Sequence, residues 1–135
     1  MSITSYQSNR VLDYNFGATS YTTPATLYVG LSTTPINFDG TGATEPVALG
    51  YARVAVTNNK TNWSTAASGI LSNLTAIQFP ESTGSWGTIT HVAVYDAASA
   101  GNMLYFEALT SSRAVPTLTT VLFAAAGFVV QMNNT

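Results

Sequence analysis

The amino-acid sequence predicts a mainly β protein: a single-domain, antiparallel β-sandwich that is jelly-roll-like, with a short N-terminal helix. A series of short apolar segments, separated by glycine, proline and asparagine, is typical of strands joined by turns. Several segments carry apolar residues on both faces, and only 7% of all residues are charged, so the predicted sheet needs a second layer. The length of 135 residues suits one domain, residues 1–135.

Residues 1–20 form an N-terminal segment that contains the expected helix. Between Tyr6 and Phe16, the residues Val11, Leu12 and Phe16 approximate helical spacing. Gly17 suits a left-handed cap at the end of such a helix. The first residues lack the basic and apolar regions of a secretory signal, so we expect no export signal here.

The next segments alternate with loops. Residues 26–32 place Leu27, Val29 and Leu31 on one face with a period of two, which predicts a strand. Glycines, prolines and isolated acids break any periodicity over 35–50, which predicts a long surface loop. Apolar residues alternate again over 51–57, with Ala52, Val54 and Val56 on one face, which predicts a second strand. Turn-forming asparagines at 58 and 59 end this strand.

The second half of the chain predicts further strands. Residues 69–80 fit either two short strands or one bent strand, which Pro80 ends because it has no N–H. The strands beginning at Thr88 and Asn102 are joined by small residues and should form an antiparallel hairpin. Residues 118–132 predict one or two further strands, and the apolar run from Val121 to Val130 within them predicts a buried strand with a bend at Gly127. It is shorter than the roughly 20 residues of a membrane-spanning helix, so we expect no membrane partner.

Composition and motifs argue against several function classes. A net charge of −2 and a pI near 5.0 give no basic surface for nucleic acid. There is no cysteine, the six carboxylates are dispersed, and no nucleophile-elbow motif is present. His91 is the single histidine, and we expect it to be a packed or interfacial residue. The sequence therefore predicts no enzyme, no metal site and no cofactor.

Aromatic and basic residues are the candidates for a protein interface. Arg53 and Arg113 are expected to pair with a carboxylate such as Glu107 or Asp96, or to contact a neighbouring chain. Tryptophan and tyrosine either belong to the core or, on an outward face, anchor an interface. The candidate interface residues are His91, Arg53, Arg113, Trp63, Trp86, Tyr95 and Tyr105.

Five blocks carry a family resemblance. They are residues 24–31 (PATLYVGL), 50–53 (GYAR), 76–80 (AIQFP), 86–97 (WGTITHVAVYDA) and 101–105 (GNMLY). Together they resemble a family of small tailed-bacteriophage virion proteins, which are labelled head decoration (cement), minor tail or tail-fibre proteins. The chain departs from the pattern at residues 115–120, where relatives have a Gly-Asp turn. The resemblance implies a structural virion component that forms a homotrimer and has no enzymatic role.

Two virion roles follow from the resemblance. A compact chain without coiled-coil heptads or fibrous repeats favours a capsid decoration protein on the capsid exterior, which binds the major capsid protein and copies of itself. The alternative is a tail, baseplate or tail-fibre component, which could bind a glycan through Trp63 or Trp86 on an exposed loop. In either role, weakly charged strands with many threonines suit contacts that salt screens little.

Overall fold

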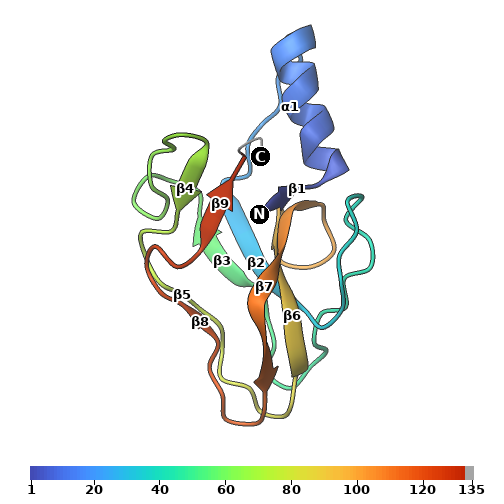
Figure 1. Cartoon of the computed structure of the whole chain (residues 1–135), viewed down its shortest axis with the longest axis vertical. Coiled ribbons are helices and arrows are strands. Elements are labelled where there is room, and N and C mark those ends of the chain that lie inside the picture. Colours follow the sequence, from blue (N-terminus) through green and yellow to red (C-terminus); the bar gives the residue numbers. More distant parts are fainter. Residues whose placement is uncertain (133–135) are drawn as a thin grey trace.

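The computed structural model describes residues 1–132 and is mainly β, with one helix near the amino terminus (Figure 1). In chain order the elements are β1 (Ser2–Ile3), α1 (Ser5–Gly17), β2 (Thr26–Ser32), β3 (Val54–Thr57), β4 (Ile70–Ser72), β5 (Ile77–Gln78), β6 (Gly87–Tyr95), β7 (Met103–Val115), β8 (Leu122–Phe123) and β9 (Val129–Gln131). The predicted mainly β class with a short N-terminal helix is confirmed. A single domain over 1–135 stays a prediction, and residues 133–135 lie outside the described part of the chain.

One five-stranded antiparallel sheet, in the order β1-β7-β6-β2-β3, forms the larger layer. Its centre is the predicted hairpin β6–β7, in which Val94 lies opposite Tyr105. Asp96 fixes the turn, because its Oδ1 accepts the backbone N–H of Asn102 at 2.7 Å while its own N–H donates to the Asn102 carbonyl at 3.1 Å. Gly101 completes the turn at a φ of +70°, which glycine adopts without strain.

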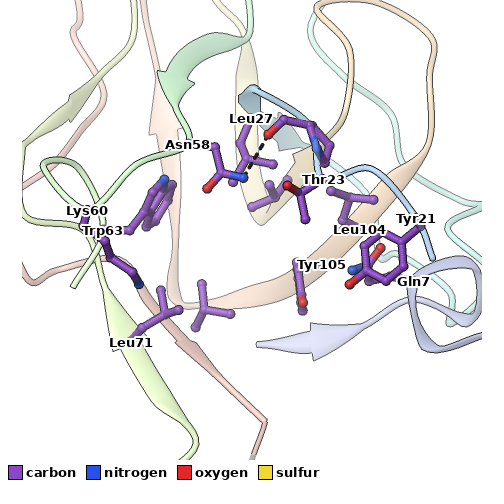
Figure 2. A pocket seen from close by; sticks show the side chains of 13 residues that line it. Gln7, Tyr21, Thr23, Leu27, Asn58, Lys60, Trp63, Leu71, Leu104 and Tyr105 are labelled. Atoms are coloured by element: carbon purple, nitrogen blue, oxygen red, sulfur yellow. Dashed lines mark hydrogen bonds between the residues drawn. The ribbon is translucent and has the colours of Figure 1, made fainter. Parts of the chain in front are cut away.

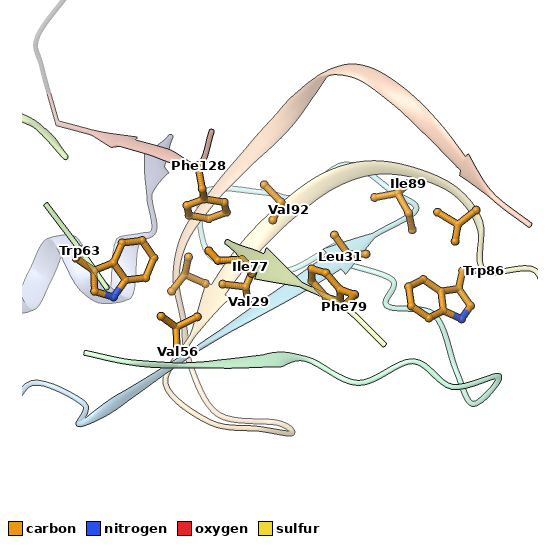
Figure 3. Packing of buried hydrophobic residues seen from close by; sticks show 12 residues of the cluster. Val29, Leu31, Val56, Trp63, Ile77, Phe79, Trp86, Ile89, Val92 and Phe128 are labelled. Atoms are coloured by element: carbon orange, nitrogen blue, oxygen red, sulfur yellow. The ribbon is translucent and has the colours of Figure 1, made fainter. Parts of the chain in front are cut away.

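Two short sheets, β4–β9 and β5–β8, form the second layer. They and their flanking segments cover one face of the large sheet and enclose the apolar core (Figure 3). The large sheet contributes Val29, Leu31, Val56, Ile89, Val92 and Val94, and the opposing segments contribute Trp63, Ile77, Phe79 and Phe128. The ring of Phe123 meets the ring of Phe128 edge to face, at 5.4 Å between centroids. The sandwich thus has one continuous layer and one divided layer.

The structure confirms the predicted strand at residues 26–32 and shortens the next. The predicted strand over 51–57 begins only at Val54, because residues 51–53 have no strand partner in β2, whose pairing with β3 ends at Val29 opposite Val54. Residues 69–80 form two short strands, β4 and β5, which is the first of the two predicted alternatives.

Residues 118–132 form two strands, β8 and β9, so the second of the two predicted alternatives is confirmed and the single bent strand from Val121 to Val130 is not formed. A turn separates them, in which the N–H of Gly127 donates to the carbonyl of Ala124 at 2.9 Å and Ala126 has a φ of +63°. The bend predicted at Gly127 therefore lies inside this turn. Much of the run is exposed rather than buried, because each of the two short sheets has only one face against the core.

The helix α1 is one residue longer at each end than the sequence predicts. Thr4 begins it: the fully buried Oγ1 accepts the N–H of Gln7 at 3.3 Å and donates to the carbonyl of Met103 at 2.7 Å. Ala18, not Gly17, adopts the left-handed cap, with a φ of 51° and its N–H bonded to the Asp13 carbonyl. The predicted cap is therefore wrong by one residue, because Gly17 still belongs to the last helical turn.

The turn after β7, where the sequence departs from its relatives, is held by the buried Ser82. Its Oγ donates to the carbonyl of Pro116 at 2.6 Å and accepts the N–H of Thr119 at 3.0 Å. Its carbonyl accepts the N–H of Leu118, which has a φ of +59°. One hydroxyl group thus fixes the end of the larger sheet against the second layer.

Asn73 joins β4 to the turn between β8 and β9. Its fully buried side chain donates from Nδ2 to the carbonyls of Thr75 and Ala124, each at 2.9 Å, and accepts the N–H of Phe128 at 2.8 Å through Oδ1. Because this turn carries Phe128 into the core, the amide of Asn73 fixes the geometry of the divided layer.

We expect Asn73→Ala to lower the free energy of unfolding by about 3 kcal/mol, because it leaves buried backbone groups without partners. Urea denaturation measures the loss. Asn59→Ala is the matched control, since Asn59 accepts the N–H groups of Thr61 and Asn62 in an exposed turn where water replaces it. We expect a loss of about 1 kcal/mol or less there, and equal losses in the two variants would contradict the role given to Asn73.

Candidate functional site

Arg53 and Glu45 form an ion pair beside the outer face of the large sheet. The Arg53 Nη2 lies 2.7 Å from Glu45 Oε2, and Arg53 Nε donates to Glu45 Oε1 at 3.0 Å, so the contact is bidentate. Nη1 of Arg53 donates to the carbonyls of Ala97 and Ala100 at 2.8 and 2.9 Å. The guanidinium carbon also lies 3.4 Å from the ring centroid of Tyr95. Arg53 therefore joins the loop over 35–50 to the β6–β7 turn.

Tyr51 and Gly30 complete this cluster. The hydroxyl of Tyr51 donates to Glu45 Oε1 at 2.7 Å and accepts the N–H of Leu31 at 2.9 Å. A Cβ at Gly30 would lie 2.8 Å from Glu45 Oε1 and 3.0 Å from the ring of Tyr95. Glycine in the middle of β2 is thus what lets the carboxylate approach the sheet.

The electrostatics of the cluster follow from burial and from this pairing. Burial raises the pKa of Tyr95 to about 12, and it also raises the pKa of Tyr51. Burial acts to lower the pKa of Arg53, but the hydrogen bond and charge of Glu45 outweigh it, and the pKa of Arg53 lies above its ordinary value. Both charges are neutralised within the chain, so the cluster is a structural brace.

A pocket of about 250 Å³ opens between the start of α1, residues 21–27 and the β4–β9 sheet (Figure 2). Most of the surface of its wall is apolar, and the apolar side chains that line it are Pro24, Leu27, Leu71, Val94, Leu104 and Val130. Its polar lining comes from Gln7, Tyr21, Thr23, Asn58, Lys60, Trp63 and Tyr105. Burial raises the pKa of Tyr105, whose hydroxyl therefore stays protonated well above neutral pH.

The helix α1 projects from the sandwich (Figure 1). One side of it is covered by the returning chain, because the Arg10 guanidinium lies 4.1 Å from the ring centroid of Tyr21 and donates to the carbonyl of Thr22 at 3.0 Å. The opposite side carries Leu12, which is 53% exposed, and Phe16, which is 88% exposed. This apolar side of α1 is a candidate contact surface.

The structure separates the candidate interface residues rather than gathering them. Trp63, Trp86 and Tyr95 are buried in this chain, which is the core alternative of the two that the sequence left open for the aromatic residues. Trp86 packs in the core and donates from Nε1 to the carbonyl of Leu49 at 2.8 Å. Neither tryptophan stands on an exposed loop where a glycan could stack on its ring.

The other candidates keep some surface. His91 is half-buried, and its Nδ1 lies 2.8 Å from the hydroxyl of Thr90. Tyr105 is half-buried in the wall of the pocket, and Arg113 is exposed on β7. Arg113 forms no ion pair within residues 1–132, so neither Glu107 nor Asp96 is its partner in that range.

Sequence reasoning missed the partner of Arg53 and the pocket. It expected Arg53 to pair with a carboxylate such as Glu107 or Asp96, or to contact a neighbouring chain; Arg53 does pair with a carboxylate, but this is Glu45, which lies in an irregular loop without periodicity. Gly30 inside a strand was the available signal, because such a glycine often marks a close approach. The sequence did not indicate that Gln7 lines a pocket, since nothing distinguishes it from other polar residues of the helix.

In residues 1–132, no helix is long and apolar enough to cross a membrane. The same range contains no group of three His, Asp or Glu side chains placed to hold a metal ion.

We expect Arg53→Met to lower the free energy of unfolding by about 3 kcal/mol, because it leaves the carboxylate of Glu45 without its partner. Arg113→Met removes an exposed guanidinium and is the control, with an expected change within about 0.5 kcal/mol. Chemical denaturation of both variants makes the comparison. A loss at Arg53 no larger than that at Arg113 would refute the bracing role.

Spectrophotometric titration at 295 nm should show three tyrosines that ionise later in the folded protein than in the unfolded chain. In the folded protein Tyr51 and Tyr95 should remain protonated at pH 11, and Tyr105 should ionise later than in the unfolded chain, because burial raises the pKa of all three; the tyrosines of the unfolded chain should titrate together at about pH 10. A raised folded-state pKa gives stability that is present below about pH 10 and is lost as the pH rises toward 12. Identical titration curves for the folded and unfolded chains would contradict this.

Comparison with known proteins identifies the family. No curated protein sequence matches this chain. Residues 2–131 match the family described as Podophage GP4 fiber I protein gp80, and this match covers nearly the whole chain. It confirms the resemblance to tailed-phage virion proteins and gives the protein its place in the phage virion. The chain belongs to the podophage GP4 fiber I protein gp80 family.

Proposed function

We propose that this protein is a structural component of a phage tail fibre and assembles there as a homotrimer. The match of residues 2–131 to a fibre-protein family carries the proposal. That match favours the tail-fibre alternative over capsid decoration, which the sequence alone had favoured. The trimer is implied by the family resemblance.

The surface of the protein supports a role in assembly. Few charges are available, and the Glu45–Arg53 pair neutralises two of them within the chain. The apolar side of α1, with Leu12 and Phe16, is the surface that we propose for contacts with neighbouring virion proteins.

The edge of β7 is less suited to that task. Ile89 lies opposite Arg113 and His91 opposite Ala108, so three additional residues of β7 bulge out between these two pairs. A bulge of this kind breaks the row of hydrogen-bonding groups on which another strand would pair. We therefore assign the contact to α1 rather than to strand addition.

We also infer that the protein acts without catalysing a reaction. The imidazole of His91 stands beside the hydroxyl of Thr90, and the carboxylate of Glu45 is held by Arg53 and Tyr51. A catalytic histidine is oriented by a carboxylate, and within residues 1–132 no carboxylate is hydrogen-bonded to His91, while the carboxylate of Glu45 is occupied by Arg53 and Tyr51.

Quantitative mass spectrometry of purified particles tests the proposed location. We expect a copy number on the order of tens, and a multiple of three, because fibres are few and a trimer contributes three chains each. Cryo-electron microscopy of the same particles should place the density on the tail. Hundreds of copies on the shell, bound to the major capsid protein, would overturn the tail-fibre proposal in favour of capsid decoration.

A further inference from the structure

Two buried polar atoms in the pocket described above have no hydrogen-bond partner within residues 1–132: Oε1 of Gln7 and Nε1 of Trp63. The two residues are only 7% and 5% exposed. Buried polar groups in folded proteins are nearly always paired, so two exceptions lining one pocket indicate a ligand. Trp63 and Gln7 stand at opposite sides of the pocket (Figure 2). A matching ligand accepts a hydrogen bond at one end and donates one at the other.

The remaining lining defines the chemistry of that ligand. Among residues 1–132, no carboxylate lines the pocket, and the one charged lining group is that of Lys60, whose Nζ already donates to the carbonyl of Ser64 at 2.8 Å. The hydroxyl group of Tyr21 can donate or accept, and that of Tyr105, which donates weakly to Sδ of Met132 at 3.9 Å, can also accept. The wall between them is apolar. Such a pocket suits an uncharged molecule with several hydroxyl groups at its edge and a C–H face.

The size of the pocket limits the ligand further. Its volume of about 250 Å³ lies below the ~300–1,000 Å³ that is typical of sites for drug-sized molecules. One six-membered ring suits this space, whereas an extended peptide needs a longer groove. We propose that the pocket binds one uncharged sugar residue, with Trp63 Nε1 donating to a ring hydroxyl and Gln7 Oε1 accepting from another. That the sugar belongs to a host-surface glycan rests on the proposed function, but the binding itself does not.

Saturation-transfer NMR on the purified full-length chain tests the proposal. The probes are D-glucose, D-galactose, D-mannose, L-rhamnose and N-acetyl-D-glucosamine, each added separately as the free monosaccharide. We expect at least one of them to receive saturation from the wild-type protein. Trp63→Phe and Gln7→Leu should each weaken the binding of that sugar about tenfold, because each removes one hydrogen bond to the ligand.

Trp86→Phe is the matched control, because it also replaces a buried core indole, but one whose N–H donates to Leu49 away from the pocket. We expect it to bind the sugar as the wild type does. The chain has two tryptophans, so in this variant Trp63 is the sole indole fluorophore, and the sugar should shift its emission. Circular dichroism establishes that each variant is folded.

The proposal is overturned if the folded wild-type protein gives no saturation transfer to any of the five sugars. It is equally overturned if Trp63→Phe and Trp86→Phe, both folded, bind the sugar with equal affinity. Particle location is measured independently of these experiments. A tail location without sugar binding would refute the pocket assignment alone, and sugar binding by a shell protein would refute the fibre proposal alone.

Discussion

The approach of the Glu45 carboxylate to the sheet above Gly30 is the constraint on which the rest of the outer face depends. The carboxylate occupies space that any side chain at position 30 would enter, and it orders Arg53 and Tyr51 around itself. Through Arg53 the same contact reaches the carbonyls of the β6–β7 turn. A long loop, the approach to β3 and the central hairpin are therefore fixed by one ion pair, which salt screens little because Arg53 is almost fully buried.

Because Glu45 and Arg53 pair with each other, two of the few charged side chains contribute little to the charge of the surface. The chain has four basic and six acidic residues, so little charge is left to keep its copies apart in solution. The fold is stabilised by apolar packing, by edge-to-face aromatic contacts such as Phe123 against Phe128, and by buried polar side chains that hydrogen-bond backbone groups, such as Asn73. This balance suits a protein that is held among neighbours in a virion.

The sequence predicted what depends on local pattern and missed what depends on distant contacts. The strict alternation of apolar residues predicted β2, and the small residues between β6 and β7 predicted the hairpin. The sequence left one or two strands open between Leu118 and Met132, and it could not decide between them because the amide that fixes the intervening turn, that of Asn73, lies far away in the sequence. Among the candidate interface residues, composition could not separate core from surface, and the structure buries Trp63, Trp86 and Tyr95.

The proposed virion contact and the proposed sugar pocket both involve α1, but they use different sides of the helix. Gln7 faces the pocket, while Phe16 follows nine residues later, which at 3.6 residues per turn lies half a turn around the helix. A neighbour that covered the Gln7 side would close the pocket and exclude any ligand. The side with Leu12 and Phe16 is free of that conflict, because Arg10, Tyr14 and Tyr21 pack on the pocket side. Assembly through the outer side of α1 therefore leaves the pocket open.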